Sequence, residues 1–421
     1  MNIIKKSINN IPVTIIKTNK FKSIVGMLSF KMPIKKEMIT TRRLIRMLLS
    51  HTCNKYKSPK DLSINLLDNY GAYYNYSVVR EGNYIINKFS FRVLEDKYTK
   101  QSNLKNVLDT FKETIFNPNC DGKSFNKEEF DLFYQRMKSD IESIIERPKS
   151  YAMNKLCDEM GGEDSVISYK PTIEELSKVT SKNLYKDYLD MINNSQIEFI
   201  IAGELNDDEA YDYSNYILKN LKQNNYDIPL IIKNDKIEDK FKEKIEEYNG
   251  KQSILTIGFK LDDLTEFERL YVLPIYCGVL GGGASSRLFN IVREKNSLAY
   301  SCFSRYEKDD SVMFIIAGIE KDNYEKARDL IKQVVSSMND INEEEILRVK
   351  EEILTSLKES TDNLQNYPEI IFNGKLYNMG SIENRMENIK KVTKEDLKEV
   401  HKKVFLTNSY FLKGMKTNGN N

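Results

Sequence analysis

The stretch GGGASSRLFNIVREKNSLAYS, residues 281–301, is the most informative part of this chain. Its three glycines follow an apolar segment, residues 270–280, which we expect to be helical. Glycines at this point permit positive φ angles and close approach of the backbone, and Ser285 or Ser286 is placed to cap the next helix. Exposed N–H groups there would suit a peptide carbonyl or a carboxylate. The triplet alone, however, favours a simple helix-terminating turn.

Two further residues of this stretch have ordinary interpretations when each is taken alone. Arg293 lies within a run of charges and is typical of a solvated helix position. Tyr300 begins a predicted strand and is typical of a packed residue whose hydroxyl lies at an edge. A phosphate-binding loop is excluded because the spacing GxxxxGK[ST] is absent.

Taken together, residues 281–301 resemble, in type and spacing, the glycine-rich and Arg/Tyr segments of the insulinase-like (pitrilysin) zinc peptidases. The resemblance implies that Arg293 and Tyr300 orient the substrate backbone and polarise its carbonyl. It also implies that Gly281, Gly282 and Gly283 contact substrate. Donors of this kind stabilise negative charge that develops on the attacked carbonyl, but only beside a metal-bound nucleophile.

The metal motif of that family, HxxEH, is missing from this chain. Two histidines four residues apart on a helix, with a glutamate base between them, supply most of a hydrolytic zinc site. Aligning the predicted helix 36–50 with the metal helix of the family places Arg42 and Arg46 at the histidine positions and Ile45 at the base. Two cations and an isoleucine cannot hold a dication, so we expect no metal in this chain.

The other candidate ligands do not complete a metal site. The downstream carboxylate of the family falls on the predicted helix 135–146, in a loose alignment at Asp140. The only histidines, His51 and His401, have no second soft ligand at usable spacing, and we expect surface or packing roles for both.

Within the family, the chain is most similar to the bacterial branch in which two different half-length subunits pair, as in the mitochondrial processing peptidase. The segment Leu67–Ala72 also looks like the non-metal member of such a pair. The resemblance implies a partner that bears HxxEH and zinc, and a peptide substrate. The rival interpretation is an inert structural or peptide-binding protein, comparable to the core proteins of respiratory complexes.

Three pairs of segments recur in the same order along the two halves of the chain. They are residues 23–31 and 253–260, 125–130 and 341–346, and 179–184 and 392–397. A repeat of such long period indicates duplicated domains. Each half is expected to be α+β, a mainly antiparallel sheet with helices on one face. We expect homologous domains at 1–218 and 252–421, joined by a polar linker at 219–251.

The composition of the chain indicates which binding partners and which cellular compartment to expect. Lys and Arg total 64 against 62 Asp and Glu, a net charge of +2, and no basic patch indicates nucleic acid. No apolar run is long enough for a membrane span, and no signal-peptide core stands at the start. Five scattered cysteines without a CxxC pair suit reduced thiols. We expect a soluble cytoplasmic protein without nucleic-acid or membrane partners.

Overall fold

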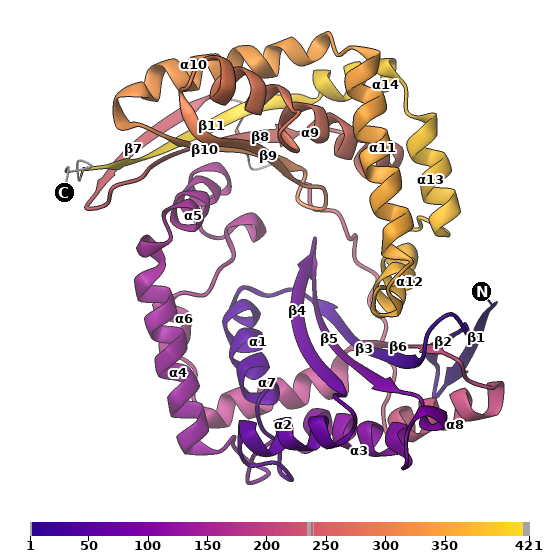
Figure 1. Ribbon diagram of the computed structural model, residues 1–421. Coiled ribbons are helices and arrows are strands. Elements are labelled where there is room, and N and C mark those ends of the chain that lie inside the picture. Colours follow the sequence, from indigo (N-terminus) through magenta and orange to yellow (C-terminus); the bar gives the residue numbers. More distant parts are fainter. Residues whose placement is uncertain (1, 234–236, 239, 416–421) are drawn as a thin grey trace. The chain divides into compact units, whose positions relative to one another are not determined.

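The computed structural model describes residues 2–233, 237–238 and 240–415 and contains two compact units (Figure 1). The first unit combines the described residues up to Ile141 with Pro171–Leu230 and Glu359–Gly380. The second combines Glu142–Lys170 with Ile231–Lys358 and with the residues from Ser381 onward, so far as the structure describes them. Each unit therefore includes one segment that comes from the other half of the sequence.

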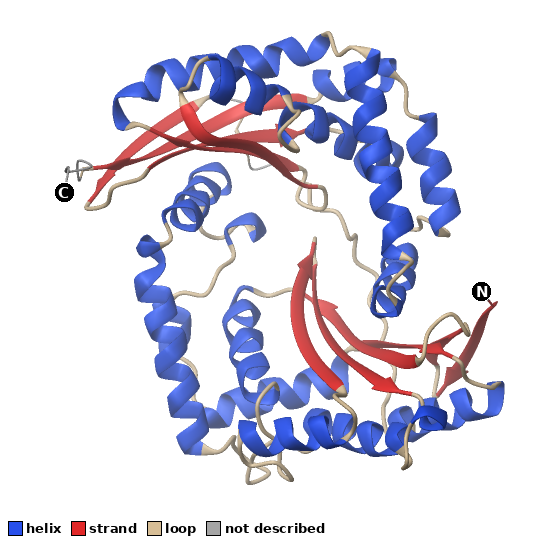
Figure 2. Ribbon diagram, viewed as in Figure 1, coloured by secondary structure: helices blue, strands red, loops and turns tan. Residues whose placement is uncertain are grey.

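The first unit contains a six-stranded sheet in the order β1-β2-β6-β3-β5-β4 (Figure 2). The strands are β1 Asn2–Ile8, β2 Ile11–Lys17, β3 Ser23–Pro33, β4 Tyr73–Glu81, β5 Tyr84–Leu94 and β6 Gln196–Gly203. Strands β2 and β6 run parallel, and all other neighbours are antiparallel. Strands β4 and β5 form a hairpin.

The second unit contains a five-stranded sheet in the order β7-β11-β8-β10-β9. The strands are β7 Lys242–Tyr248, β8 Ser253–Leu261, β9 Ala299–Glu307, β10 Val312–Ile319 and β11 Val404–Gly414. Strand β7 is parallel to β11, and the other neighbours are antiparallel. Strands β2, β6, β3, β5 and β4 correspond in turn to β7, β11, β8, β10 and β9, in order and direction. The predicted α+β duplication is confirmed.

Part of the stretch predicted to be a linker, 219–251, is structured. Residues 242–248 form β7, an edge strand beside β11, and residues 207–218 form the helix that precedes the stretch. The sequence of β7, KEKIEEY, contains few apolar residues because an edge strand with exposed faces needs few, and Ile245 is half exposed. Because most residues of β7 are charged, its sequence lacks the alternation of apolar and polar residues that would indicate a strand.

The main helical layer of each unit covers one face of its sheet. In the first unit it consists of α1 Lys36–Leu49, α2 Pro59–Asp68, α3 Asn103–Phe116, α4 Lys127–Glu142, α6 Ile173–Ser177, α7 Ser181–Asn194 and α8 Asp207–Leu218. In the second it consists of α9 Leu273–Gly281, α10 Tyr324–Ser336, α11 Glu343–Ser360, α13 Ile382–Lys391 and α14 Lys394–Lys402. Side chains of Asn126, Thr180 and Thr393 form N-caps of α4, α7 and α14. None of the helices in the described ranges is long and apolar enough to cross a bilayer.

The opposite face of each sheet is covered by a helix from the other half of the chain. Helix α12, Tyr367–Leu376, packs on β3 and β6 of the first sheet, and α5, Pro148–Gly161, packs on β8 and β11 of the second. Phe372 of α12 joins an apolar cluster with Met27 and Ile200. The Lys88 ammonium, only 5% exposed, bonds the Glu369 carboxylate of α12 at 2.6 Å. These contacts make the exchanged helices part of the cores.

We expect Glu369→Gln to lower the free energy of unfolding of the first unit by about 1.5–3 kcal/mol, because it leaves the buried Lys88 ammonium without its anion. Asp362→Asn is the matched control, since Asp362 pairs with Lys20 in an exposed position and should be neutral. Urea titration followed by tyrosine fluorescence measures both variants. Equal effects of the two substitutions would contradict the structural role of the Lys88–Glu369 pair.

Candidate functional site

The glycine turn follows the end of α9, and its three glycines have different surroundings. A Cβ on Gly281 would lie 2.4 Å from the backbone nitrogen of Ser304 in β9, so only glycine fits there. A Cβ on Gly283 would meet nothing within 4 Å, and Gly282 and Gly283 are exposed. None of the three has a positive φ. The glycines thus allow close approach to β9, while the left-handed conformation that they permit is not used.

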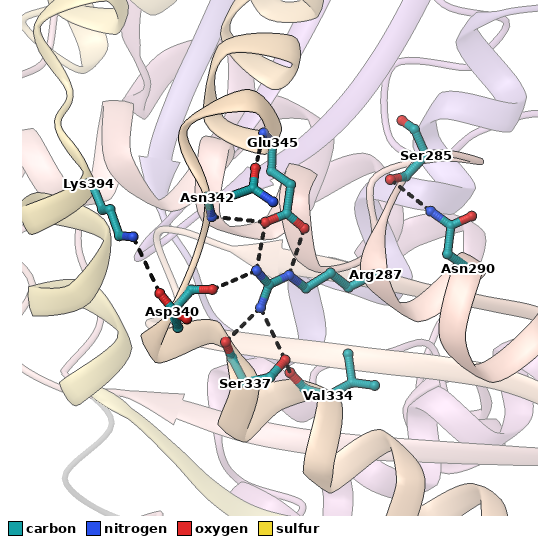
Figure 3. Close-up of polar contacts among 9 residues, drawn as sticks. All are labelled: Ser285, Arg287, Asn290, Val334, Ser337, Asp340, Asn342, Glu345 and Lys394. Carbon is teal, nitrogen blue, oxygen red and sulfur yellow. Dashed lines mark hydrogen bonds and ion pairs between the residues drawn. The ribbon is translucent and has the colours of Figure 1, made fainter. Parts of the chain in front are cut away.

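The serines of the turn hold it together and do not cap the next helix as expected. The Ser286 hydroxyl donates to the Gly283 carbonyl at 2.6 Å. The Asn290 amide donates to the Ser285 carbonyl at 3.2 Å (Figure 3). The helical turn that follows continues as a π-helical segment, η5, Phe289–Lys295. The turn therefore presents residues 282–285 on a fixed frame.

Arg293 lies on η5 with its guanidinium accessible. Its side chain is 43% exposed, its Nε lies 3.6 Å from a carboxylate oxygen of Glu294, and its Cζ lies 4.5 Å from the centre of the Phe289 ring. An exposed pair of neighbouring residues contributes little stability, so Arg293 is free to exchange Glu294 for another acceptor.

Tyr300 lies at the start of β9, an edge strand, and is half exposed. Its hydroxyl is 3.1 Å from the Ile319 carbonyl and 3.0 Å from a carboxylate oxygen of Glu320. A phenol has one proton, so it donates to only one of these acceptors at a time. Burial, with the hydrogen bond to Glu320, raises the pKa of Tyr300 to about 12, and the hydroxyl is neutral at physiological pH.

The connection between Arg293 and Tyr300 is held by backbone hydrogen bonds. Ser297 N–H donates to the Arg293 carbonyl and Leu298 N–H to the Val292 carbonyl, both at 3.0 Å. Ser297 has a φ of 50°, in the left-handed region. The structure thus connects both predicted site residues through one ordered turn.

Arg287, to which the sequence analysis gave no role, anchors the whole segment (Figure 3). Its guanidinium forms a fork with the Glu345 carboxylate, with Nε and Nη2 at 2.7 and 2.6 Å from the two oxygens. It also donates to the carbonyls of Ser337 and Asp340, at 2.6 and 2.8 Å. The fork joins the glycine segment to the end of α10 and the start of α11. Its signal in the sequence is weak, because the partner is 58 residues away.

Glu345 is held in this fork while it also caps α11. One carboxylate oxygen accepts the Asn342 N–H at 3.1 Å, and the Asn342 side chain accepts the Glu345 N–H at 2.8 Å. Burial alone would raise the pKa of Glu345, but the bonds from Arg287 and Asn342 outweigh it, so the pKa is lowered.

The residues at the family's metal positions form a structural cluster on α1. Arg42 is 1% exposed and donates to the Asp187 carbonyl at 2.7 Å, with Asp190 3.8 Å away. Ile45 is fully buried in the core of the first unit, and Arg46 is half buried. Burial lowers the pKa of Arg42, although a guanidinium stays charged at any pH at which proteins fold. By the alignment predicted from the sequence, a guanidinium takes the position of a zinc ligand, so these residues do not fit zinc.

The remaining candidate ligands have other partners. The Asp140 carboxylate lies 3.2 Å from the Arg43 guanidinium. His51 Nδ1 is 2.7 Å from the Met47 carbonyl, and His401 Nδ1 is 2.9 Å from the buried Tyr276 hydroxyl. Across the described residues, no group of three His, Cys, Asp or Glu side chains is arranged to hold a metal ion.

Comparison with known proteins agrees with this geometry. The family model described as the Peptidase M16 inactive domain matches residues 178–353. The chain is similar to a probable inactive metalloprotease of Bacillus subtilis, YmfF, with 26% identity over 98% of both chains. A crystal structure of a conserved protein from Enterococcus faecalis has 25% identity, covers 100% of both chains and gives a TM-score of 0.89. An M16 inactive domain from Pseudomonas fluorescens gives 0.76 at 16% identity over 100% of both chains.

The duplicated fold and the altered metal helix define a class, the peptidase-like proteins that lack the residues for hydrolytic zinc. Within that class, the chain is similar to inactive homologues of the insulinase-like M16 family, whose inactive-domain model matches residues 178–353.

We expect Glu345→Gln to lower the free energy of unfolding at pH 7 by about 1.5–3 kcal/mol, because the bonds from Arg287 lose their anionic acceptor. The folded-state pKa of Glu345 is lowered, so its contribution is full above the unfolded value, about 4.3, and is lost as pH falls through the folded value. The difference from wild type should therefore shrink in acid. The control is Glu344→Gln, an exposed position on the same helix turn; a pH-independent difference for Glu345→Gln would contradict the assignment.

We expect the purified chain to bind no molar equivalent of zinc and to cleave no peptide, because Arg42, Ile45 and Arg46 replace the ligands and the base. Metal analysis by mass spectrometry after dialysis against zinc, with a parallel peptidase assay, tests this. A tightly bound equivalent together with chelator-sensitive activity would show that the assignment of α1 is wrong.

Proposed function

We propose that this chain is the non-catalytic, substrate-orienting subunit of a heterodimeric zinc metallopeptidase that cleaves peptides or small unfolded proteins in the cytoplasm. The observation that carries the proposal is a contrast within one chain. On α1, the predicted counterpart of the family's metal helix, Arg42 is buried, while Arg293 and Tyr300 are exposed at the two ends of one ordered turn. The five cysteines are free, which suits a reducing compartment.

In this proposal the partner subunit bears HxxEH and supplies the zinc that activates the nucleophile. Arg293 leaves its exposed contact with Glu294 and donates to a carbonyl of the substrate backbone. Tyr300 turns its proton from Ile319 or Glu320 toward the carbonyl under attack. A neutral phenol is the form that this donation needs, and the raised pKa of Tyr300 maintains it.

The glycine turn contributes a surface on which a substrate backbone lies close. Gly283 has open space where a side chain would stand, so an extended peptide can approach the main chain there. Gly281 has a different role, because its contact with Ser304 fixes the turn against β9. We therefore assign substrate contact to Gly282 and Gly283, and positioning to Gly281.

A second candidate is an inert peptide-binding protein. It is favoured by the two sheets, in which β4 and β9 are outer strands, each paired with one neighbour. An outer strand has unpaired N–H and C=O groups that can bind an extended peptide. The relative YmfF is itself described as a probable inactive metalloprotease. Affinity purification from the native cell separates the candidates, since only the first requires a partner that bears HxxEH.

We expect Arg293→Ala or Tyr300→Phe to lower kcat/KM of the assembled heterodimer by about one to three orders of magnitude, because each removes a donor that acts on the substrate carbonyl. Arg305→Ala is the control, since this side chain is 64% exposed on the same strand, β9, and has no proposed role.

Size-exclusion chromatography confirms that each variant subunit pairs with the partner before its peptidase activity is measured. If a complex assembled with either variant retains full turnover, the proposed substrate-orienting role is contradicted. Arg293 and Tyr300 would then have only ordinary surface and packing roles.

A further inference from the structure

Helix α2, Pro59–Asp68, turns amide side chains toward the protein and apolar side chains toward solvent. Its Asn65 side chain donates to the Thr110 hydroxyl of α3 at 2.8 Å and accepts from the Tyr56 hydroxyl at 2.9 Å. Asn69, which ends the helix, is buried. A surface helix normally buries its apolar stripe and exposes its polar face. The packing of the first unit does not account for this reversal.

The apolar side chains that α2 exposes are neighbours on the helix. Leu62 is the buried residue of α2, whereas Ile64 and Leu67 are exposed. Leu67, at 70%, has the highest exposed fraction of the large apolar side chains in the described part of the chain. Residues three apart share a helix face, and long side chains lean toward the N-terminus of their helix. Leu67 and Ile64 therefore form one apolar surface.

Two charges without partners flank this apolar surface. Lys60 is four residues before Ile64 and Asp68 is four residues after it, so the three side chains lie in one row along the helix. Both charged side chains are exposed, and neither has an ion-pair partner within the described ranges. The row has a cation at one end, an apolar centre and an anion at the other end.

A row of this kind is complementary to itself. When two α2 helices pair antiparallel about a twofold axis at Ile64, Lys60 of each copy meets Asp68 of the other. The apolar centres then cover each other. Parallel pairing would instead bring like charges together at both ends, which disfavours association. The charges of the row thus select a second copy of the same chain in one orientation.

We propose that α2 is a self-association surface through which two copies of this chain form an antiparallel, twofold-symmetric contact. One helix from each copy makes a smaller interface than a standard one, so the dimer is weak and reversible, with a dissociation constant on the order of 10 µM. The surface belongs to the first unit and includes neither Arg293 nor Tyr300. The dimer requires neither a partner that bears HxxEH nor zinc. Its failure and that of the proposed peptidase subunit are therefore distinguishable.

Sedimentation velocity of the full chain alone, over a range of concentrations around the expected dissociation constant, tests the proposal. We expect wild type to shift reversibly from monomer to dimer. Leu67→Glu should weaken the dimer at least about tenfold, because a symmetric dimer contains each substitution twice. The control Leu132→Glu makes the same change at a 65% exposed position on α4 and should leave the dimer unchanged.

Two outcomes of this experiment would overturn the proposal. The first is a wild-type chain that stays monomeric at about ten times the expected dissociation constant, which would favour a different protein as the occupant of α2. The second is a dimer that persists in folded Leu67→Glu. Thermal unfolding verifies that every variant is folded.

An exchange of charges tests the antiparallel contact itself. Lys60→Glu and Asp68→Lys should each weaken self-association by about tenfold, since each brings like charges together. Both substitutions suit the helix, because an acid near its start and a base near its end are favourable. An equimolar mixture of the two variants should dimerise like wild type, because every contact between positions 60 and 68 then joins opposite charges. A mixture that associates no better than either variant alone would contradict the antiparallel contact.

Discussion

The second unit depends on one charge-assisted contact, the fork of Arg287 on Glu345. It joins three chain segments, namely the glycine segment, the end of α10 and the start of α11. Both oxygens of the carboxylate are used, so the geometry of the pair is fixed. Arg293 and Tyr300 take their positions from this frame, because the segment that carries them begins at Arg287.

The duplicated fold could be predicted from the sequence because its evidence is repeated. Strands β3 and β8 and the capped helices at Asn126 and Asn342 recur with the same local chemistry, and local chemistry fixes caps and strand starts. The exchange of α5 and α12 could not be predicted. Nothing in the residue pattern of either helix indicates which sheet it will cover.

Some features of the candidate site can likewise be predicted from residue types, whereas others depend on long-range contacts. The prediction that this chain holds no zinc follows from residue types alone, because Arg42 and Ile45 cannot act as ligand or base in any fold. Arg287 lies inside residues 281–301, but its structural role depends on Glu345, a partner 58 residues away. The local sequence therefore does not indicate this role.

The exchanged helices also affect the order in which the chain can mature on the ribosome. Helix α5 is synthesised before any strand of the sheet that it covers, and β11, the last of those strands, ends at Gly414. The first unit likewise waits for α12, residues 367–376. At roughly 5–20 residues per second, apolar surfaces of both units stay uncovered for many seconds of translation. The two units therefore finish folding almost together, and a nascent chain interrupted before residue 367 would complete neither.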